Sequence, residues 1–554
     1  MKIESNRSLL RDTVDFLHKN IIAVIVCFVV VSGIIATLFI YMDNDSKKEK
    51  QDAVKFKASD TLFFSIRQPK NMNILTSNEV DVYQMWHLLY SGLFYFNKDL
   101  SVSPDIVDTY KTDESAGTVS LKLKQNGAFS DGSPIKADDV EFTVDAIKDI
   151  GEEGPFFSYG NKIASVEKTG EFDITINFAN PGDASLSNLV FPIISSEHFK
   201  KDLTGYDQVT SGIYSVSSQT ENGFKLSPNK GYFGKKAGND LVFSFTKQGE
   251  DLDGLITIGA VTSKMAKGIN AQSDADDLQL DFTPIISNRM EYIGFNFRNE
   301  FLKDKTLRRA IIKSINFNSL VDDYFGGLGL PNNSIYFPDF LSVKDTKSVD
   351  YSPSKAVVSL ENKGYKKIDD NNSLVTKKGE KVTLRLLIND SNSFRKSMAE
   401  DIKNYLKKIN IDLQIESVPD SEYFSRLGEG NFDIFIGGME FDQRYDLRKL
   451  FDKSGSIGYS NEDVINLADQ MEHCISPDKR QKIFRKLSER LTDDVPYYCI
   501  GYYEYGLVSG GKWAKKPDPT FFNIYDGCEN WKWRRPDSVK DKSNLKEDGE
   551  GKKS

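Results

Sequence analysis

The stretch from Phe129 to Thr143 constrains the fold of this chain more than any other feature of the sequence. Asp131-Gly132 followed by Ser133-Pro134 predicts a turn, because Gly adopts a positive φ at little cost and Pro fixes φ at about −65°. A helix is then predicted to begin at Ala137, where the carboxylates of Asp138-Asp139 complement the positive end of the helix dipole. The residues that recur with helical spacing, and so predict the buried face, are Val140, Thr143, Val144 and Ile147.

As a string, this stretch closely resembles a signature of the family 5 extracellular solute-binding proteins, the receptors of oligopeptide, dipeptide and nickel ABC importers. The matching positions are Phe129, Asp131-Gly132, Pro134, Ala137–Val140 and Phe142-Thr143. Further matches follow in the family's order at 210–216, 227–233, 292–297, 304–315 and 351–365. The resemblance covers about residues 60–533 and implies that the chain holds a ligand.

Composition and charge narrow the function classes. The chain has 554 residues, of which 39% are hydrophobic and 28% charged, so it is globular and long enough for about three or four domains. The formal net charge of −9 argues against a nucleic-acid partner, because phosphate binding needs clustered Lys and Arg. With four His and four Cys in the chain, we expect no dedicated His/Cys metal cage and no cofactor.

From Asn20 to Tyr41 the sequence is mostly apolar and carries no charge. This run is long enough to cross a bilayer, which needs about 20 residues, whereas the apolar part of a cleaved signal peptide has about 7–15. Cys27 lies inside the run and is not preceded by small residues, so the lipid attachment pattern usual in this family is missing. We therefore predict a cytoplasmic N-terminus at 1–19, a transmembrane anchor at 20–42 and a single-pass protein of the cell membrane. The body is placed outside the cytoplasm because the family resemblance requires it.

Three cysteines fall in the predicted extracytoplasmic part, Cys474, Cys499 and Cys528. An odd number allows at most one disulfide within the chain and leaves one thiol over. Cys499 lies in an apparent strand at 497–503 and Cys528 just after another, so one interpretation is a Cys499–Cys528 bridge. Three buried thiols are the other interpretation, and the sequence leaves the choice open.

The resemblance implies an α/β fold of the two-lobed periplasmic-binding-protein type (type II, Venus-flytrap), with an extra inserted domain and one N-terminal transmembrane helix. A charged linker should follow the anchor, and the C-terminal tail should be disordered because it is charged and lacks large apolar residues. The expected divisions are the linker at 43–57, lobe I at 58–93, 193–285 and 500–535, the inserted domain at 94–192, lobe II at 286–499 and the tail at 536–554.

Relatives in this family hold an extended peptide between the lobes and meet its charged amino group with a carboxylate. Main-chain pairing of this kind gives affinity that does not depend on side chains, and a buried ammonium has to be paired. In relatives the carboxylate follows a Gly-Gly pair and an aromatic residue, and aligning Gly437-Gly438 places Asp442 there. The sequence departs from the pattern, since Met439 replaces the aromatic, Gln443 replaces the Tyr after the Asp, and the terminal Pro is missing.

The resemblance therefore implies a set of ligand-binding residues in both lobes. For Asp442 the alternative is an ordinary surface carboxylate, and for Arg444 a solvated or surface-paired guanidinium. The expected roles are Asp442 as the amine partner, Gly438, Met439, Glu440 and Phe441 as a strand edge, Arg444 as a clamp for a carboxylate, and Asn71, Met72 and Asn73 as a loop that contacts ligand through its main chain.

The leading functional hypothesis is a membrane-anchored, monomeric receptor that captures peptides, expected to be oligopeptides, by lobe closure and delivers them to an ABC permease. Capture of nickel or a metal chelate is a second hypothesis. A sensing or adhesion protein that keeps the fold without transport is a third. No nucleophile–His–acid arrangement, zinc helix motif or paired-carboxylate segment stands out in the sequence, so we do not expect an enzyme.

Overall fold

The computed structural model describes residues 56–181, 184–202, 204–205, 209–344, 349–368, 373–451 and 455–536. The predicted N-terminus (1–19), anchor (20–42), most of the linker (43–57) and nearly all of the tail (536–554) lie outside these residues. Within the described ranges, no helix is both long and apolar enough to span a bilayer. The anchor therefore stays a prediction.

The first sheet has the strand order β2-β11-β10-β9. β2 and β11, far apart in sequence, pair in parallel, while β10 is antiparallel to both of its neighbours, β9 and β11. In β2 the alternate residues Leu62, Phe64 and Ile66 are buried, because successive side chains of a strand point to opposite faces. The strands are β2 (Thr61–Arg67), β9 (Tyr214–Thr220), β10 (Gly223–Pro228) and β11 (Asp240–Thr246).

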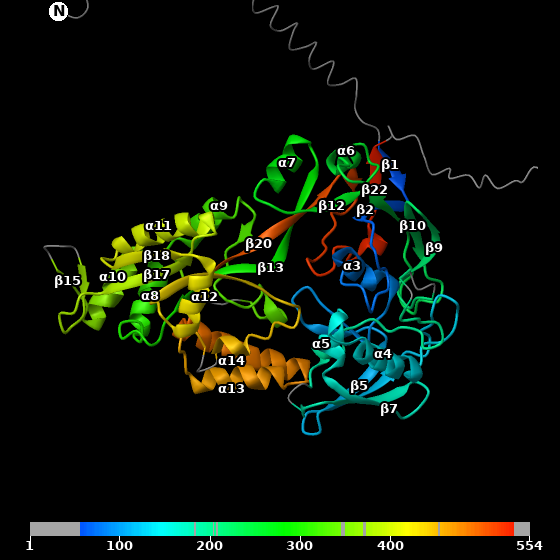
Figure 1. The fold of residues 1–554 in the computed structure, drawn as a ribbon, viewed down its shortest axis with the longest axis horizontal. Coiled ribbons are helices and arrows are strands. Elements are labelled where there is room, and N and C mark those ends of the chain that lie inside the picture. The colour runs from blue at the N-terminus through cyan, green and yellow to red at the C-terminus, as the bar shows by residue number, and fades with distance from the viewer. Residues whose placement is uncertain are drawn as a thin grey trace, which may run out of the picture. The chain divides into compact units, whose positions relative to one another are not determined.

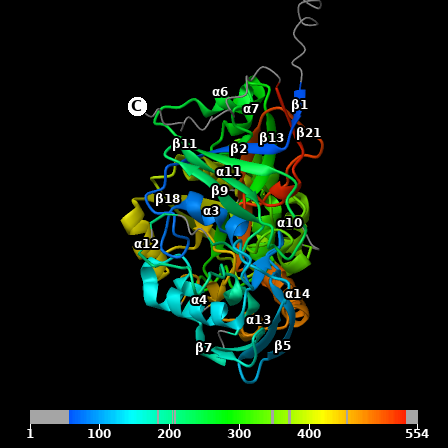
Figure 2. The ribbon, with the colours of Figure 1, turned by 90° about the vertical axis from the view of Figure 1, so that its right-hand side faces the viewer.

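Helix α3 (Val80–Leu89) packs against β9 beside this sheet (Figures 1 and 2). The sequence predicts a helix that runs on to Leu93, and this extension is wrong. The backbone is already extended at Tyr90, with φ −132° and ψ 146°, and the chain passes from there into the short strand β3 (Phe94–Phe96).

A second sheet, fully antiparallel, has the order β5-β6-β8-β7 and lies against helix α4 (Ala137–Ile150). The predicted helix start at Ala137 and the predicted buried face are confirmed. Asp139 is itself buried, because its carboxylate accepts hydrogen bonds from Lys136 N and Ser196 N, each 2.9 Å long. The strands are β5 (Val107–Asp113), β6 (Thr118–Leu123), β7 (Ile163–Lys168) and β8 (Asp173–Phe178).

The largest sheet has the order β12-β20-β13-β19-β17-β18, with β14 also paired to β20. Its strands are β12 (Ser263–Ala266), β13 (Asp281–Phe295), β14 (Gly329–Leu330), β17 (Thr383–Asn389), β18 (Asp412–Val418), β19 (Ile434–Glu440) and β20 (Tyr497–Ser509). The helices between residues 305 and 494 are α8 (Lys305–Ser314), α9 (Phe317–Tyr324), α10 (Pro353–Lys363), α11 (Ser393–Lys407), α12 (Asp420–Glu429), α13 (Glu462–Glu472) and α14 (Pro477–Asp494).

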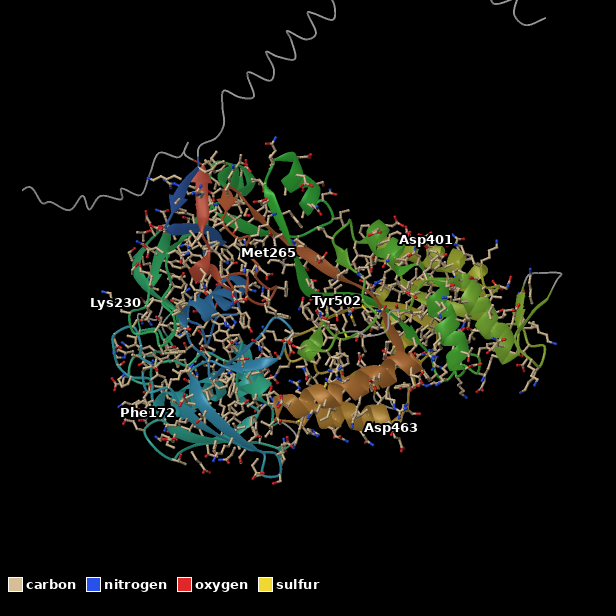
Figure 3. All side chains as sticks on the ribbon, turned by 180° about the vertical axis from the view of Figure 1, so that it is seen from behind. Phe172, Lys230, Met265, Asp401, Asp463 and Tyr502 are labelled. Carbon is tan, nitrogen blue, oxygen red and sulfur yellow. The ribbon has the colours of Figure 1, made fainter. Side chains whose placement is uncertain are left out.

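The long strands β13 and β20 pair along most of their length and connect the two halves of the molecule (Figure 1). Figure 3 labels Met265, which pairs with Leu507 toward one end of this ladder, and Tyr502 near its middle. The register shifts between Ile286 and Met290, so that β13 contains a bulge there. A bulge bends its strand and increases the local twist, and this one lies where the chain crosses between the halves.

Each half has its own hydrophobic core. One core runs from Leu62 to Phe243 and includes Tyr525 and Trp533 near the C-terminal end. Two further cores are built almost entirely from residues 290–502. The protein is therefore two-lobed, with mixed α/β content. The predicted inserted domain at 94–192 shares the first core, so its boundaries stay a prediction.

Shorter elements complete the described chain. They are β1 (Phe56–Ser59), β4 (Val102–Pro104), η1 (Gly151–Glu153), α5 (Phe157–Gly160), η3 (Leu186–Leu189), α6 (Leu252–Thr257), α7 (Ala271–Asp277), η4 (Phe340–Ser342), β15 (Lys366–Ile368), β16 (Ser373–Val375), η5 (Arg448–Phe451), β21 (Lys512–Trp513), η6 (Cys528–Asn530) and β22 (Trp533–Pro536).

The three cysteines in the described chain, Cys474, Cys499 and Cys528, are buried thiols. Of the two interpretations that the sequence leaves open, the structure has the one without a disulfide. Cys499 belongs to β20 in the second lobe's core, whereas Cys528 belongs to the core of the first lobe.

Candidate functional site

Strand β19 has one edge that is only partly covered. It pairs with β13 over its whole length, but with β17 only through Ile434 and Phe435. Beyond Phe435, no described strand pairs with that outer edge. Phe441, just after the strand, bonds to Asn288 on the β13 side. Because backbone groups alternate between the two edges of a strand, the even-numbered residues 436, 438 and 440 face the outer edge.

The groups on this outer edge are accessible. The carbonyl of Ile436 accepts a hydrogen bond from the Tyr423 hydroxyl (2.7 Å), whereas Gly438 and Glu440 are exposed. Gly438 has no side chain to shield its backbone. The edge therefore offers the N–H and C=O groups of Gly438 and Glu440 to an additional extended segment.

The bulge of β13 fixes the end of β19. Phe441 N donates to Asn288 O (3.1 Å), and Asn288 Nδ2 donates to Phe441 O (2.7 Å). The Phe441 ring is buried and stacks on Tyr445, with ring centres 4.3 Å apart. Met439 is half-buried against the same core. Phe441 and Met439 thus hold the end of β19 against the core. The hydrogen bonds from the bulge to Phe441 fix the position at which the chain leaves the strand and continues into Asp442.

Asp442 forms an ion pair with Arg444. Nη2 and Nε of Arg444 lie 2.7 and 3.2 Å from Oδ2 of Asp442, and the backbone N of Arg444 donates to Oδ1 (2.9 Å). The Asp442 side chain is 52% exposed and that of Arg444 only 19%. The carboxylate predicted to meet a ligand's amino group therefore already has a cation beside it.

Arg444 also reaches the first lobe. Its Nη1 donates to Ser158 O (2.9 Å) and its Nη2 to Ser158 Oγ (3.2 Å), and its guanidinium carbon lies 4.5 Å from the centre of the Tyr159 ring. Although burial disfavours its charge, Tyr159 and the Asp442 carboxylate raise the pKa of Arg444 above its ordinary value. Arg444 is therefore a charged link between α5 and the segment after β19.

The predicted first-lobe loop makes contacts within its own lobe. Met72 N donates to Thr204 O (2.8 Å), and the Asn73 side chain donates to Lys200 O (3.2 Å). Met72 and Asn73 are buried, and Asn71 bonds to Thr76 through its side chain (2.9 Å). The structure thus shows these three residues supporting the loop, and their role in binding stays a prediction.

A cavity of about 670 Å³ lies beside α3. Its walls come from the end of α3, the segment after β3, the part of β13 just before the bulge, and the loop at 518–529. The lining residues used below are His87, Lys98, Asp105, Gln443, Asp518, Asp526 and Glu529. Of the residues predicted to bind ligand, none lines this cavity, although Gln443 next to Asp442 does.

The cavity wall is acidic. Burial raises the pKa of Asp105 to about 6, although the Gly92 N–H (2.9 Å) and the charge of Lys124 act to lower it. Burial also raises the pKa of Asp526 and of Glu529. A positively charged group in this cavity would remove part of the cost of ionising these carboxylates.

His87 and Lys98 are the basic groups of the same wall. Burial lowers the pKa of His87 to about 3, so its imidazole is neutral near pH 7. Lys98 is already paired, since its Nζ lies 2.5 Å from Oδ2 of Asp518. The carboxylates of the wall are therefore only partly balanced by positive charge.

Sequence reasoning missed most of this cavity. The loop at 518–529 has no family motif in the sequence, and only its turn-forming residues and aromatics mark it as an ordered loop. In the described chain, no group of three or more His, Cys, Asp or Glu side chains is arranged to hold a metal ion.

Comparisons with known proteins agree on one family. The family model "Bacterial extracellular solute-binding proteins, family 5 Middle" matches residues 101–452. The chain is 24% identical over 498 residues to the oligopeptide-binding protein AppA of Bacillus subtilis (strain 168), covering 83% of this chain and 89% of that protein. It is 21% identical over 441 residues to the nickel-binding protein NikA of Staphylococcus aureus (strain NCTC 8325 / PS 47), covering 76% and 84%. Its fold is similar to that of the unliganded open form of the periplasmic murein tripeptide-binding protein MppA, with a TM-score of 0.71, 16% identity, and 87% and 99% of the two chains covered.

Proposed function

Because the chain belongs to the bacterial extracellular solute-binding proteins of family 5, we propose that it captures peptides between its lobes and delivers them to an ABC permease. The observation that carries this proposal is the outer edge of β19, where Gly438 and Glu440 are exposed beyond the last pairing with β17. An extended peptide can add to such an edge and pair through its main chain, whatever its side chains are.

Asp442, which follows the end of β19, supports the same proposal. A peptide added to the edge would bring its charged amino group close to this carboxylate, which is half exposed. An ammonium withdrawn from water needs such a partner. In this proposal the ammonium competes with Arg444 for Asp442, and its entry loosens the link from Arg444 to Ser158.

The acidic cavity beside α3 has room for side chains of a bound peptide. At about 670 Å³ it lies within the range of ligand pockets, about 300–1,000 Å³. Its carboxylates favour peptides with basic side chains, because a cation near Asp105, Asp526 or Glu529 offsets their burial. We propose that the first-lobe loop of Asn71, Met72 and Asn73 contacts the peptide through its main chain.

Two further parts of the proposal concern the cell. We propose that the span 20–42 anchors the protein in the membrane, with a monomeric body outside the cytoplasm, so that receptor and permease share one membrane. Local concentration would then offset weak affinity. A sensing or adhesion protein with the same ligand specificity is the alternative, and loss of peptide uptake on deletion of the gene separates transport from it.

The test is to identify the cargo. The full-length chain is purified natively and denatured, and the released small molecules are identified by mass spectrometry. We expect short peptides from the native protein and few from the Asp442→Asn variant. The matched control is Asp446→Asn, which removes a carboxylate with a very similar arginine pair (Nη2–Oδ2 2.7 Å) four residues after Asp442.

The outcome also separates ligand classes. Because some relatives are named as nickel-binding proteins, the same sample is analysed for bound metal. Release of a nickel chelate without peptides would replace the peptide proposal by metal capture. No cargo, together with no thermal shift on adding a peptide pool, would contradict both.

A further inference from the structure

The two lobes touch where α14 comes close to the first-lobe sheet that contains β5 (Figure 1). This contact is separate from the β13–β20 ladder, which carries the chain from one lobe to the other. It has a polar part at the N-terminus of α14 and an apolar part in which each lobe buries a side chain of the other. The lobes are thus held together at a place that the chain itself does not connect.

Glu114 of the first lobe binds the N-terminus of α14. It lies in the turn after β5, where the carboxylate of Asp113 accepts a hydrogen bond from Ser115 N (3.0 Å) and so fixes the turn. Oε2 of Glu114 lies 2.9 Å from Nζ of Lys479, and the carboxylate also accepts from the Ser476 N–H. The bond from Lys479 contributes most to lowering the pKa of Glu114 below its ordinary value.

Glu114 supplies a cap that α14 lacks within its own sequence. Ser476 occupies the N-cap position but makes no side-chain capping bond, and the first N–H groups of a helix have no partner within it. The helix dipole favours a negative charge at this end. Sγ of Cys474 adds a contact 3.6 Å from Oε1 of Glu114. Separating the lobes would therefore leave the end of an 18-residue helix without its cap.

Each lobe also buries an apolar side chain of the other. Ile475, just before α14, is 2% exposed and belongs to the core of the first lobe. Leu100, which follows β3 in the first lobe, is 3% exposed and belongs to a core of the second lobe, together with Phe340 and Leu341. Both side chains would return to water if the lobes separated, so their burial favours the contact.

A second polar bridge lies beside Leu100. The Leu341 N–H donates to the carbonyl oxygen of Asp99 (2.9 Å), and the Ser342 hydroxyl donates to the Asp99 carboxylate. Gln481 in α14 donates from its side chain to the carbonyl oxygen of Leu341 (2.8 Å). The second-lobe sides of the two polar contacts are therefore joined to each other.

The backbone at this bridge is strained. Leu100, Asp339, Leu341 and Ser342 have φ values of 59°, 56°, 52° and 58°, and they are four of the eight non-glycine residues with positive φ in the described chain. Side chains make this conformation unfavourable. It persists where surrounding contacts enforce it, and it is concentrated at switch regions. Here the enforcing contacts come from the opposite lobe.

We propose that this contact is a latch that holds the lobes together before any ligand binds, with Glu114 and Ile475 as its main parts. Because the lobes move as bodies about the β13–β20 ladder, the bonds of Glu114 to α14 and of Asp99 to Leu341 would break together. The latch sets the open fraction of the unliganded protein, and a ligand enters only through the open form. This inference does not depend on what the cleft binds.

The test is hydrogen–deuterium exchange of the full-length chain without added ligand, read by mass spectrometry. In Glu114→Gln we expect two segments to exchange about five- to tenfold faster, because both lie at the contact that opens. One is 474–480, at the start of α14, and the other is 337–344, which contains the Leu341 N–H. Strands β8 and β17, one in each lobe, should keep their wild-type rates.

Glu171→Gln is the matched control, because Glu171 pairs with Lys136 inside the first lobe (Oε1–Nζ 2.7 Å). It should leave both segments unchanged. Faster exchange in 474–480 alone would show that Glu114 is a local helix cap, and this would overturn the latch. Equal exchange of Glu114→Gln and the wild type in both segments would overturn it as well.

Ile475→Ala tests the apolar part without changing a charge. We expect faster exchange in 337–344, although Ile475 belongs to the other core, because a weaker contact opens more often. Faster exchange throughout the first-lobe core, with 337–344 unchanged, would make Ile475 an ordinary core residue and contradict the latch. No peptide enters either experiment, so the result stands whether or not the proposed function fails.

Discussion

Arg444 forms an ion pair with Asp442, with Nη2 2.7 Å and Nε 3.2 Å from Oδ2, and it also donates a hydrogen bond to the carbonyl oxygen of Ser158 in the first lobe. Four residues further on, Arg448 pairs with Asp446 in a similar way, with Nη2 2.7 Å from Oδ2. Only the first pair directly follows the open edge of β19. In the proposed binding mode, an amino group that enters along that edge would meet a carboxylate that is already paired with an arginine of the protein itself.

Removing Arg444 should strengthen the binding of peptides with a free amino terminus. In Arg444→Met the carboxylate loses its internal counter-ion, and we expect affinity to rise by about tenfold. In Asp442→Asn we expect a loss of about tenfold or more, because the ammonium is left without a charged partner. Isothermal titration of the full-length chain with one defined peptide measures both.

The control for this prediction uses the neighbouring pair and a blocked ligand. Arg448→Met should leave peptide affinity unchanged, and an acetylated amino terminus should remove the difference between wild type and both variants. If the acetylated peptide responds as strongly as the free one, Asp442 does not meet the amino group.

Local features of the fold could be predicted from the sequence. The start of α4 at Ala137 follows from turn chemistry, and the strand β8 (Asp173–Phe178) follows from the alternation of its residues. The end of α10 at Gly364 was expected from the family resemblance, and its φ of 104° is one that glycine adopts at low cost. The end of α3 at Leu89 was not predicted, because neither Tyr90 nor Ser91 is a strong helix breaker and the first glycine comes only at Gly92.

The site was less predictable, because its properties depend on long-range contacts. Asp442 and Arg444 are close in sequence, but the burial of Arg444 depends on Ser158 and Tyr159 in another part of the chain. The cavity wall at 518–529 meets α3 only after the chain has returned to the first lobe. Neither relation leaves a local pattern in the sequence.

Gly438 should not tolerate a side chain. A Cβ at this position would lie 2.4 Å from Nη2 of Arg395 and 2.9 Å from Oε1 of Glu291. These two residues form a buried bidentate pair, with Nε–Oε2 and Nη2–Oε1 distances of 2.8 and 3.1 Å. We expect Gly438→Ala to lower the free energy of unfolding by about 1–3 kcal/mol, because the methyl group has to displace this pair.

Urea unfolding of the full-length chain measures the effect, with Gly428→Ala as the matched control. At Gly428, in α12, a Cβ meets no atom within 4 Å, so alanine should raise the free energy of unfolding by about 0.5–1 kcal/mol through helix propensity. Equal stability of the Gly438→Ala variant and the wild type would contradict the predicted clash.

The cysteines at 474, 499 and 528 should be present as thiols that react slowly in the native state. Burial and the neighbouring Glu114 raise the pKa of Cys474 to about 11, and burial raises the pKa of Cys528 well above its ordinary value. Thiolates are the reactive form, so we expect little alkylation by iodoacetamide at neutral pH. Peptide mapping without reductant should then find all three sites alkylated after denaturation. A Cys499–Cys528 linked peptide would contradict the structure.

Asp105 should make the stability of the protein fall as the pH rises from about 4 to about 6. Burial raises the pKa of its carboxyl from 3.8 to about 6 in the folded protein, so in this range the folded chain holds a proton that the unfolded chain has lost. The contribution of Asp105 is therefore fully present below pH 3.8 and is lost as the pH passes 6.

We expect the free energy of unfolding of the wild type, relative to Asp105→Asn, to decrease by on the order of 2 kcal/mol between pH 4 and pH 7. Urea unfolding at both pH values measures this difference. Asp277→Asn, at an exposed position of α7, serves as the control and should run parallel to the wild type. A constant difference between wild type and Asp105→Asn across this range would show that Asp105 is ionised in the folded protein at pH 4, as an exposed carboxylate would be.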